Sequence, residues 1–168
     1  MAIDTGCKPK MMMIPPLETL RLLQGASESR ESFADGVSMR PKRVLVADDF
    51  ESVRCAVGEL LRGSFEVVDM VSDGKAALDA VLALKPDLIV LDISMPGLSG
   101  LDVAKELKSR ANRTKIVFLT VHEDSRIVAA CLSAGASGYV VKELMASDLI
   151  PAMNEALAGR VFVSRLSV

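Results

Sequence analysis

The residues of this chain that could do chemistry stand at the ends of short apolar runs. Three carboxylates, one hydroxyl and one amine are placed in this way: Asp48, Asp49, Asp92, Thr120 and Lys142. Asp92 interrupts the run LIVLDI, and an isolated buried carboxylate is costly unless a cation or hydrogen bonds compensate its charge. The sequence therefore predicts that Asp92 has polar partners, and the other four residues are the candidates.

Three carboxylates and a lysine in one place would indicate phosphoryl chemistry assisted by a metal ion. Carboxylates a few ångströms apart repel by about 4 kcal/mol per close pair at an effective dielectric constant of about 20. A hard divalent cation removes that repulsion, and oxygen ligands with room for water suit Mg²⁺. Asp92 could then act as a nucleophile towards a phosphoryl group, with Lys142 and the Thr120 hydroxyl binding its oxygens.

A regular alternation of apolar runs and amphipathic stretches would position these residues. Strands are expected at residues 44–47, 65–71, 88–91, 115–120 and 139–141. Helices, with apolar side chains at i, i+3, i+4 and i+7, are expected at residues 53–61, 75–84, 99–108, 124–133 and from about 147 to 158. Ser147 is the predicted cap of the last helix, with Pro151 near its first turn.

Five strand–helix units of this kind predict a parallel sheet with right-handed crossovers and helices on both faces. The expected fold is α/β and flavodoxin-like, a (βα)5 three-layer α/β/α sandwich with strand order 2-1-3-4-5. In such a sheet the carboxyl ends of strands 1, 3, 4 and 5 meet around one cleft, where ligands bind. The five chemistry-bearing residues are predicted to lie there.

Composition and charge reduce the range of possible functions further. The chain has 168 residues and a net charge of −2, which gives no reason to expect a surface for nucleic acid or membrane. Its three cysteines are far apart and lack a zinc-like spacing, so buried thiols in a reducing cytoplasm are expected. No apolar run reaches the roughly 18 residues that span a bilayer.

The domain organisation is expected to be simple. Residues 1–41 are interpreted as a disordered or loosely packed extension, with a short helix possible at residues 17–24. Residues 42–158 form the predicted domain. Residues 159–168 are interpreted as a short tail, either the remnant of a linker or a segment that packs elsewhere.

The motifs VLVADD, LIVLDISMPGLSGLDV, FLT and AGASGYVVKE together resemble the receiver domain of two-component response regulators. The resemblance implies that Asp92 accepts phosphate from a histidine kinase or a phosphotransfer protein. It also implies a Mg²⁺ site in which Asp49 and Asp92 are direct ligands, Asp48 acts mainly through water, and Ser94 offers its backbone carbonyl.

The segments GASGYVVKE and GRVFVS most resemble those of the NarL/FixJ-type subfamily, whose members usually carry a LuxR-type helix-turn-helix output domain. With nine residues after Gly159, no DNA-recognition helix is expected, and hence no direct binding of nucleic acid by this chain. Two further positions are expected to affect the site. Val121 stands where many relatives have Ala and is expected to tighten access to the site. His122 lies at a position associated with tuning dephosphorylation, although an ordinary loop histidine is the simpler interpretation.

Other functions that share parts of this pattern are less favoured. A haloacid-dehalogenase-like phosphatase needs a second Asp two residues after the nucleophile, where this chain has Ser94. A flavin or nucleotide binder needs a Gly- or Ser/Thr-rich loop after the first strand, where this chain has Asp48 and Asp49. The prediction is a signalling module that catalyses only its own phosphotransfer and dephosphorylation. Its output is left open between a protein partner, a phosphate sink or shuttle, and a truncated transcription factor.

A switch is also expected. Thr120 should move towards the phosphoryl group, and Tyr139 should rotate inward to fill the vacated space. The simpler interpretation of Tyr139 is a half-exposed strand aromatic. The surface formed by helix 4, strand 5 and helix 5 is the expected docking site for a partner or a second receiver.

Overall fold

The computed structural model describes residues 40–166, and the expectations for residues 1–39 lie outside this part of the chain. The strands are β1 (Lys42–Ala47), β2 (Phe65–Val71), β3 (Leu88–Leu91), β4 (Lys115–Thr120), β5 (Gly138–Val141) and β6 (Phe162–Val163). The helices are α1 (Glu51–Leu61), α2 (Gly74–Leu84), α3 (Gly100–Ser109), α4 (Ser125–Ser133), α5 (Met145–Leu157) and the 3₁₀ turn η1 (Lys142–Leu144).

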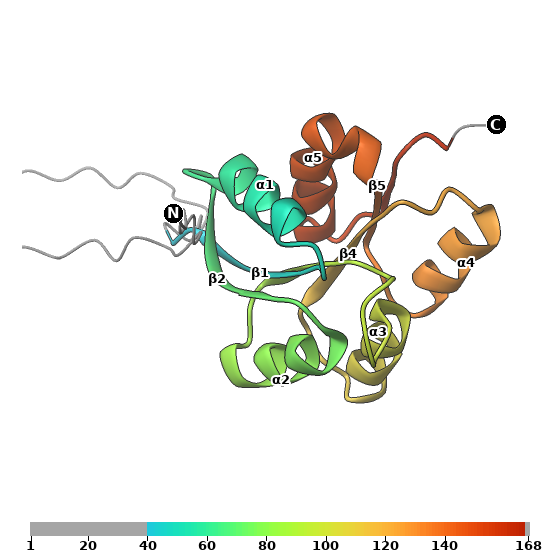
Figure 1. Cartoon of the computed structure of the whole chain (residues 1–168), viewed down its shortest axis with the longest axis horizontal. Coiled ribbons are helices and arrows are strands. Elements are labelled where there is room, and N and C mark those ends of the chain that lie inside the picture. The colour runs from blue at the N-terminus through green and yellow to red at the C-terminus, as the bar shows by residue number, and fades with distance from the viewer. Residues whose placement is uncertain (1–39, 167–168) are drawn as a thin grey trace, which may run out of the picture. The chain divides into compact units, whose positions relative to one another are not determined.

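All strands pair in parallel, in the order β2-β1-β3-β4-β5-β6. Figure 1 labels β1, β2, β4 and β5 of this sheet. The predicted order of the first five strands and the flavodoxin-like fold are confirmed. β6 is an element that the sequence analysis did not predict. It comes from the stretch interpreted as a tail, and its pairing with β5 makes it the edge strand.

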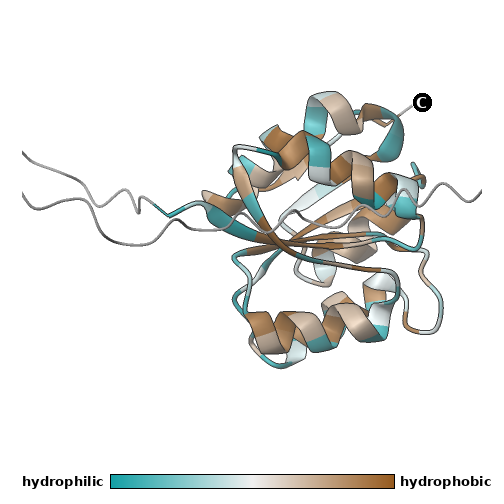
Figure 2. Cartoon of the chain, turned by 60° about the vertical axis from the view of Figure 1, so that its left-hand side comes forward, coloured by the Kyte–Doolittle hydropathy of each residue, from teal (hydrophilic) through white to brown (hydrophobic). Residues whose placement is uncertain are grey.

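The core consists of two layers, one on each face of the sheet (Figure 2). α1 and α5 cover one face, and α2, α3 and α4 cover the other. Successive side chains of a strand point to opposite faces. In β3, Leu88 and Val90 therefore join the first layer, while Ile89 and Leu91 join the second. All four are buried, which is why β3 is a continuous apolar run.

Side-chain caps begin three of the helices. Asp73, Ser99 and Asp124 accept hydrogen bonds from the first-turn amides of α2, α3 and α4. The last predicted helix is present as α5, but its predicted cap was wrong, because η1 leads directly into α5 and the helix begins two residues before Ser147. Ser147 instead donates to the Leu144 carbonyl, and Pro151 lies inside the helix.

No helix within residues 40–166 is long and apolar enough to cross a membrane.

Candidate metal and phosphoacceptor site

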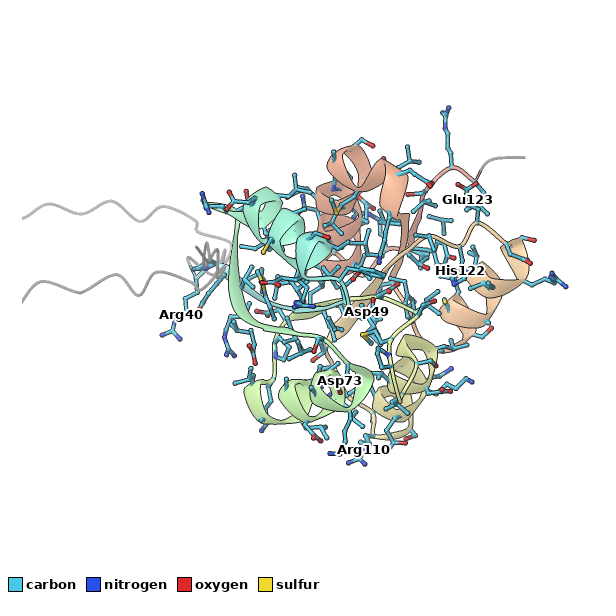
Figure 3. The ribbon with its side chains drawn as sticks, in the orientation of Figure 1. Arg40, Asp49, Asp73, Arg110, His122 and Glu123 are labelled. Atoms are coloured by element: carbon cyan, nitrogen blue, oxygen red, sulfur yellow. The ribbon has the colours of Figure 1, made fainter. Side chains whose placement is uncertain are left out.

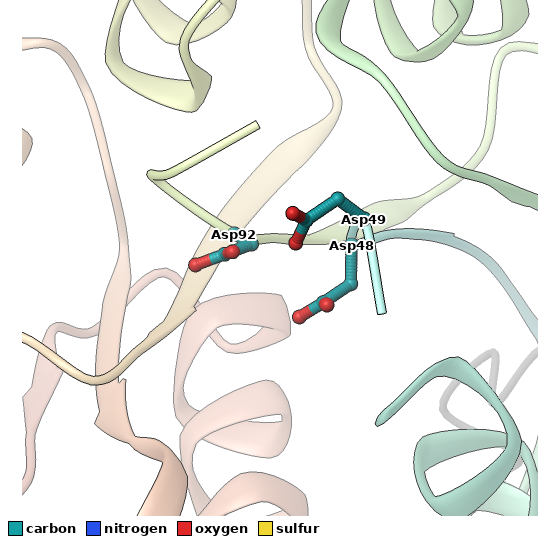
Figure 4. Close-up of side chains that lie close together, drawn as sticks. All are labelled: Asp48, Asp49 and Asp92. Atoms are coloured by element: carbon teal, nitrogen blue, oxygen red, sulfur yellow. The ribbon is translucent and has the colours of Figure 1, made fainter. Parts of the chain in front are cut away.

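The predicted carboxylates meet at the carboxyl edge of the sheet. Asp48 and Asp49 follow β1, Asp92 follows β3, and one oxygen from each lies within 4.8 Å of the others (Figure 4). Asp48 is 2% exposed and Asp92 is 3% exposed. The backbone fixes these positions, because the Asp92 amide donates to the Ala47 carbonyl at 2.8 Å. The loops that follow β1 and β3 are therefore tied together at the site.

Lys142 lies between two of the carboxylates. Its Nζ is 2.7 Å from Asp48 Oδ2 and 3.3 Å from Asp92 Oδ2. The Phe50 ring covers the same ammonium group, with its centroid 5.7 Å from Nζ. The lysine that the sequence analysis assigned to a phosphoryl oxygen thus compensates the acidic cluster in this state.

Asp49 is the carboxylate that its surroundings satisfy least. Its Oδ1 is buried without a hydrogen-bond partner. By contrast, Asp48 Oδ1 accepts from the Phe50 amide at 2.9 Å, and Asp92 Oδ1 accepts from the Ile93 amide at 2.8 Å. A buried carboxylate oxygen without a partner is costly unless a cation or a donor reaches it. Three carboxylates could each supply an oxygen ligand, and one of them has a buried oxygen without a hydrogen-bond donor. This set fits a hard divalent cation such as Mg²⁺.

Burial affects the protonation of Asp92. Burial raises the pKa of this carboxyl above its ordinary value, the positive charge of Lys142 opposes that rise, and the charge of Asp48 adds to it. The ionised form of Asp92 thus depends on the nearby ammonium group.

Two residues that support the site were missed by the sequence analysis. Arg54 Nη1 donates to the backbone carbonyls of Asp48 and Asp49, at 2.6 and 3.2 Å, and so holds the loop after β1. Gly100 begins α3, and a Cβ there would lie 1.9 Å from the Asp92 carbonyl oxygen. The sequence did offer a signal for Gly100, because it is the second glycine of the motif PGLSGL and a glycine allows close approach of the backbone.

The switch residues lie at the end of β4, on the loop after it and on β5. Thr120 is buried, and its Oγ1 accepts from the His122 amide at 3.3 Å. His122 Nε2 lies 3.0 Å from Ser94 Oγ, so its ring reaches the loop that follows β3. Figure 3 labels His122 beside Glu123, on the segment that leads to α4. The structure thus connects His122 with both Thr120 and Ser94, whereas Val121 is largely exposed.

Tyr139 differs from both sequence-based interpretations. It is fully buried, and its hydroxyl donates to the His122 carbonyl at 2.7 Å. The ring is therefore already inward in this state, and it is not a half-exposed strand aromatic. The predicted inward rotation of Tyr139 therefore cannot start from this conformation.

Comparisons with known proteins agree with this geometry. The family model of the response regulator receiver domain matches residues 44–154. The chain belongs to this receiver family. The receiver is 38% identical over 119 residues to the transcriptional regulatory protein PdtaR of Mycobacterium tuberculosis, covering 70% of this chain and 58% of that protein. It is 32% identical over 129 residues to the nitrate/nitrite response regulator protein NarL of Escherichia coli, covering 76% of this chain and 60% of that protein. The receiver thus spans about three-fifths of the length of these relatives.

Solved structures show the same fold. The signal receiver domain of NarL from Mycobacterium tuberculosis has a TM-score of 0.68 at 34% identity, covering 71% of this chain and 98% of that one. The receiver domain of RcsB from Salmonella enterica, solved with the phosphomimetic BeF₃⁻, has a TM-score of 0.69 at 25% identity, covering 75% of this chain and 95% of that one.

Proposed function

We propose that this receiver accepts a phosphoryl group on Asp92 from a sensor histidine kinase or a phosphotransfer protein, in the cytoplasm. The observation that carries the proposal is the cluster of Asp48, Asp49 and Asp92, in which Lys142 contacts Asp48 and Asp92. Membership of the receiver family supports it. The protein would act as a signalling module and not as an enzyme with an external substrate.

The donor set supports Mg²⁺ as the cofactor. Asp49 and Asp92 would be direct ligands, Asp48 would act mainly through water, and the Ser94 carbonyl would be a further ligand. Bound Mg²⁺ would supply positive charge against the phosphoryl oxygens. The orphaned Asp49 Oδ1 is the observation that favours a cation here.

The residues of the chain then have distinct roles in the transfer. A carboxylate oxygen of Asp92 attacks phosphorus, the bond from phosphorus to the donor breaks, and the donor leaves with its electron pair. Lys142 exchanges its contact with Asp92 for one with the transferred group. The Thr120 hydroxyl donates to a phosphoryl oxygen, for which it must leave the His122 amide. The His122 side chain and Val121 would affect how water reaches the product, and hence its lifetime.

The output is proposed to be a protein interaction on the surface between α4 and α5. β5 is buried along its whole length and β6 is the edge strand, so this surface consists of α4, β6 and α5. A partner protein or a second receiver would dock there. The name of PdtaR, a transcriptional regulator, favours a role in transcription as the second candidate output.

Labelling with acetyl phosphate tests the function. Intact mass should show one phosphoryl group on the wild type in Mg²⁺ and none on Asp92→Asn. Asp87→Asn is the matched control, because Asp87 precedes β3 and Asp92 follows it. Undiminished labelling of Asp92→Asn, or labelling that EDTA does not affect, would contradict the proposal.

A further inference from the structure

A cavity lies at the amino-terminal edge of the sheet, opposite the acidic cluster. This amino-edge cavity is lined by the first residues of β1 and β4, the residues before β3, and the last turns of α2 and α5. Figure 3 labels a residue at each edge of the sheet, Arg40 before β1 and Asp49 after it. The cavity has a volume of about 580 Å³. Sites for small molecules measure roughly 300–1,000 Å³, so a small molecule would fit.

Positive charge dominates the lining of the amino-edge cavity. Four cations contribute side chains to it: Lys42, Lys85, Arg113 and Lys115. Among the described residues of the lining, Asp87 is the one carboxylate. Its Oδ2 accepts from the Arg43 amide at 2.9 Å, and its Oδ1 accepts from Lys42 Nζ at 3.5 Å. Asp87 therefore balances Lys42, and the charges of the other three cations are not balanced within the cavity.

These three cations also lack partners elsewhere in the described part of the chain. Within residues 40–166, the side chains of Lys85, Arg113 and Lys115 make no hydrogen bond or ion pair. By contrast, Lys75 and Lys105 each pair with a carboxylate of their own helix. A concave surface lined by one sign of charge concentrates ions of the opposite sign. The cavity therefore favours an anion.

The end of α2 does not account for Lys85. Cations stabilise helix C-termini because the last carbonyls carry partial negative charge. Here the Leu84 carbonyl already accepts from Arg43 Nη1 at 2.7 Å. Lys85 is thus available to a ligand.

Backbone contacts fix the frame on which the cations stand. The Lys115 amide donates to the Asp87 carbonyl at 3.0 Å, and Thr114 Oγ1 donates to the Pro86 carbonyl at 2.9 Å. The loop before β4, which carries Arg113, is in this way tied to the residues before β3. A lining held in place before binding loses little conformational entropy when a ligand arrives.

The cavity also offers apolar surface. Pro86 is buried, and Leu82 of α2 and Leu157 of α5 are half-buried. Lysine and arginine bind phosphate oxygens through charged hydrogen bonds, while an organic ring gains by leaving water for apolar surface. A nucleotide combines a ring with phosphate groups, whereas a free phosphate ion would use only the cations.

We propose that the amino-edge cavity is a nucleotide site. The phosphates bind to Lys85, Arg113 and Lys115, and the ring lies against the apolar lining. The site goes beyond the proposed function and does not depend on it, because Asp92 lies at the opposite edge of the sheet.

Titration of the full chain with ADP tests the site, in EDTA so that no metal joins the phosphates to the acidic cluster. Saturable changes in amide NMR shifts are expected at residues 85–87 and 112–115. Arg113→Gln should weaken binding about tenfold, the effect of losing one hydrogen bond to a charged group. Lys105→Gln is the matched control, because Lys105 lies on α3 outside the cavity and should leave the affinity unchanged. Shifts that do not saturate, or equal affinity of Arg113→Gln and the wild type, would overturn the proposal.

The class of ligand is tested by comparing ADP with pyrophosphate and with a single-stranded oligonucleotide. Pyrophosphate should bind about tenfold more weakly than ADP, because it lacks the ring that covers apolar surface. Equal affinity for pyrophosphate would overturn the nucleotide assignment. Tighter binding of the oligonucleotide than of ADP would overturn a small-molecule site, since contacts along an extended phosphate backbone would then dominate.

Discussion

At the scale of single residues, the site balances charge against burial. Lys142 reaches Asp48 and Asp92, and Asp49 keeps a buried oxygen without a donor. The apo state therefore carries an electrostatic cost that a cation would relieve. Such a cost is typical of a site selected for binding, since an apolar or paired residue would give a more stable fold.

Asp49→Ala should separate binding from folding. The variant loses a metal ligand, so we expect its affinity for Mg²⁺ to fall at least tenfold. Without metal the loss of repulsion should stabilise the fold by about 1 kcal/mol, which raises Tm by roughly 4 °C. Thermal melts in EDTA, with Mg²⁺ titrations alongside, measure both effects. A clear loss of apo stability would instead identify Asp49 as a structural residue.

Thr120→Ala should separate phosphorylation from its consequence. The variant should still accept phosphate on Asp92, because it keeps the acidic cluster and Lys142, but the change in association that follows should disappear. Intact mass reports the first property, and size exclusion with and without beryllofluoride reports the second. Thr114→Ala is the control, since Thr114 donates to the Pro86 carbonyl just before β4. If Thr120→Ala responded like the wild type, Thr120 would have no part in the switch.

At the scale of elements, α3 is seated against the loop that carries Asp92. Gly100→Ala should destabilise the protein by about 2 kcal/mol or more, although alanine normally stabilises a helix relative to glycine. The reason is that the new Cβ would meet the Asp92 carbonyl oxygen, a backbone atom that cannot move without moving the site. Gly58→Ala in α1 is the control, because its Cβ would meet only the flexible tip of Met70. Urea unfolding compares them, and equal stabilities would contradict the proposed packing.

β5 offers a spectroscopic probe, since Tyr139 is the only tyrosine and the chain has no tryptophan. Burial, the largest cause, raises the pKa of Tyr139 to about 12. In the unfolded chain the phenol has its ordinary pKa of 10.0, so the unfolded state binds fewer protons than the native state between pH 10 and 12. Native stability should therefore fall with rising pH in this window. Absorbance at alkaline pH should show late ionisation in buffer and a midpoint near 10 in urea. A midpoint near 10 in the folded protein would contradict the burial of this ring.

At the scale of the whole molecule, most of the fold and part of the site could be predicted from the sequence. The five strands, their order and the convergence of Asp48, Asp49, Asp92 and Lys142 followed from periodicity and from the rules of parallel sheets. Local patterns carried this information because each of these residues stands at the end of a strand, with Asp48 and Asp49 sharing β1.

The remaining features depend on contacts between distant segments. β6 has too few residues to show a period, and only its pairing with β5 makes it a strand. The burial of Tyr139 depends on the loop at His122, which no local pattern indicates. The first turn of α5 was misplaced because η1 extends the helix backwards past the expected serine cap. Tertiary context thus decided the first two features, whereas the start of α5 depends on the 3₁₀ turn directly before it.

The central claim is that Asp92 carries the phosphoryl group, and site-resolved chemistry tests it most directly. Borohydride reduces an acyl phosphate to an alcohol, so phosphorylated aspartate becomes homoserine and is located by peptide mass. After acetyl phosphate and Mg²⁺, we predict homoserine at position 92, and none when EDTA replaces the metal. Homoserine at position 48 or 49, or equal conversion of position 92 with and without Mg²⁺, would contradict the account.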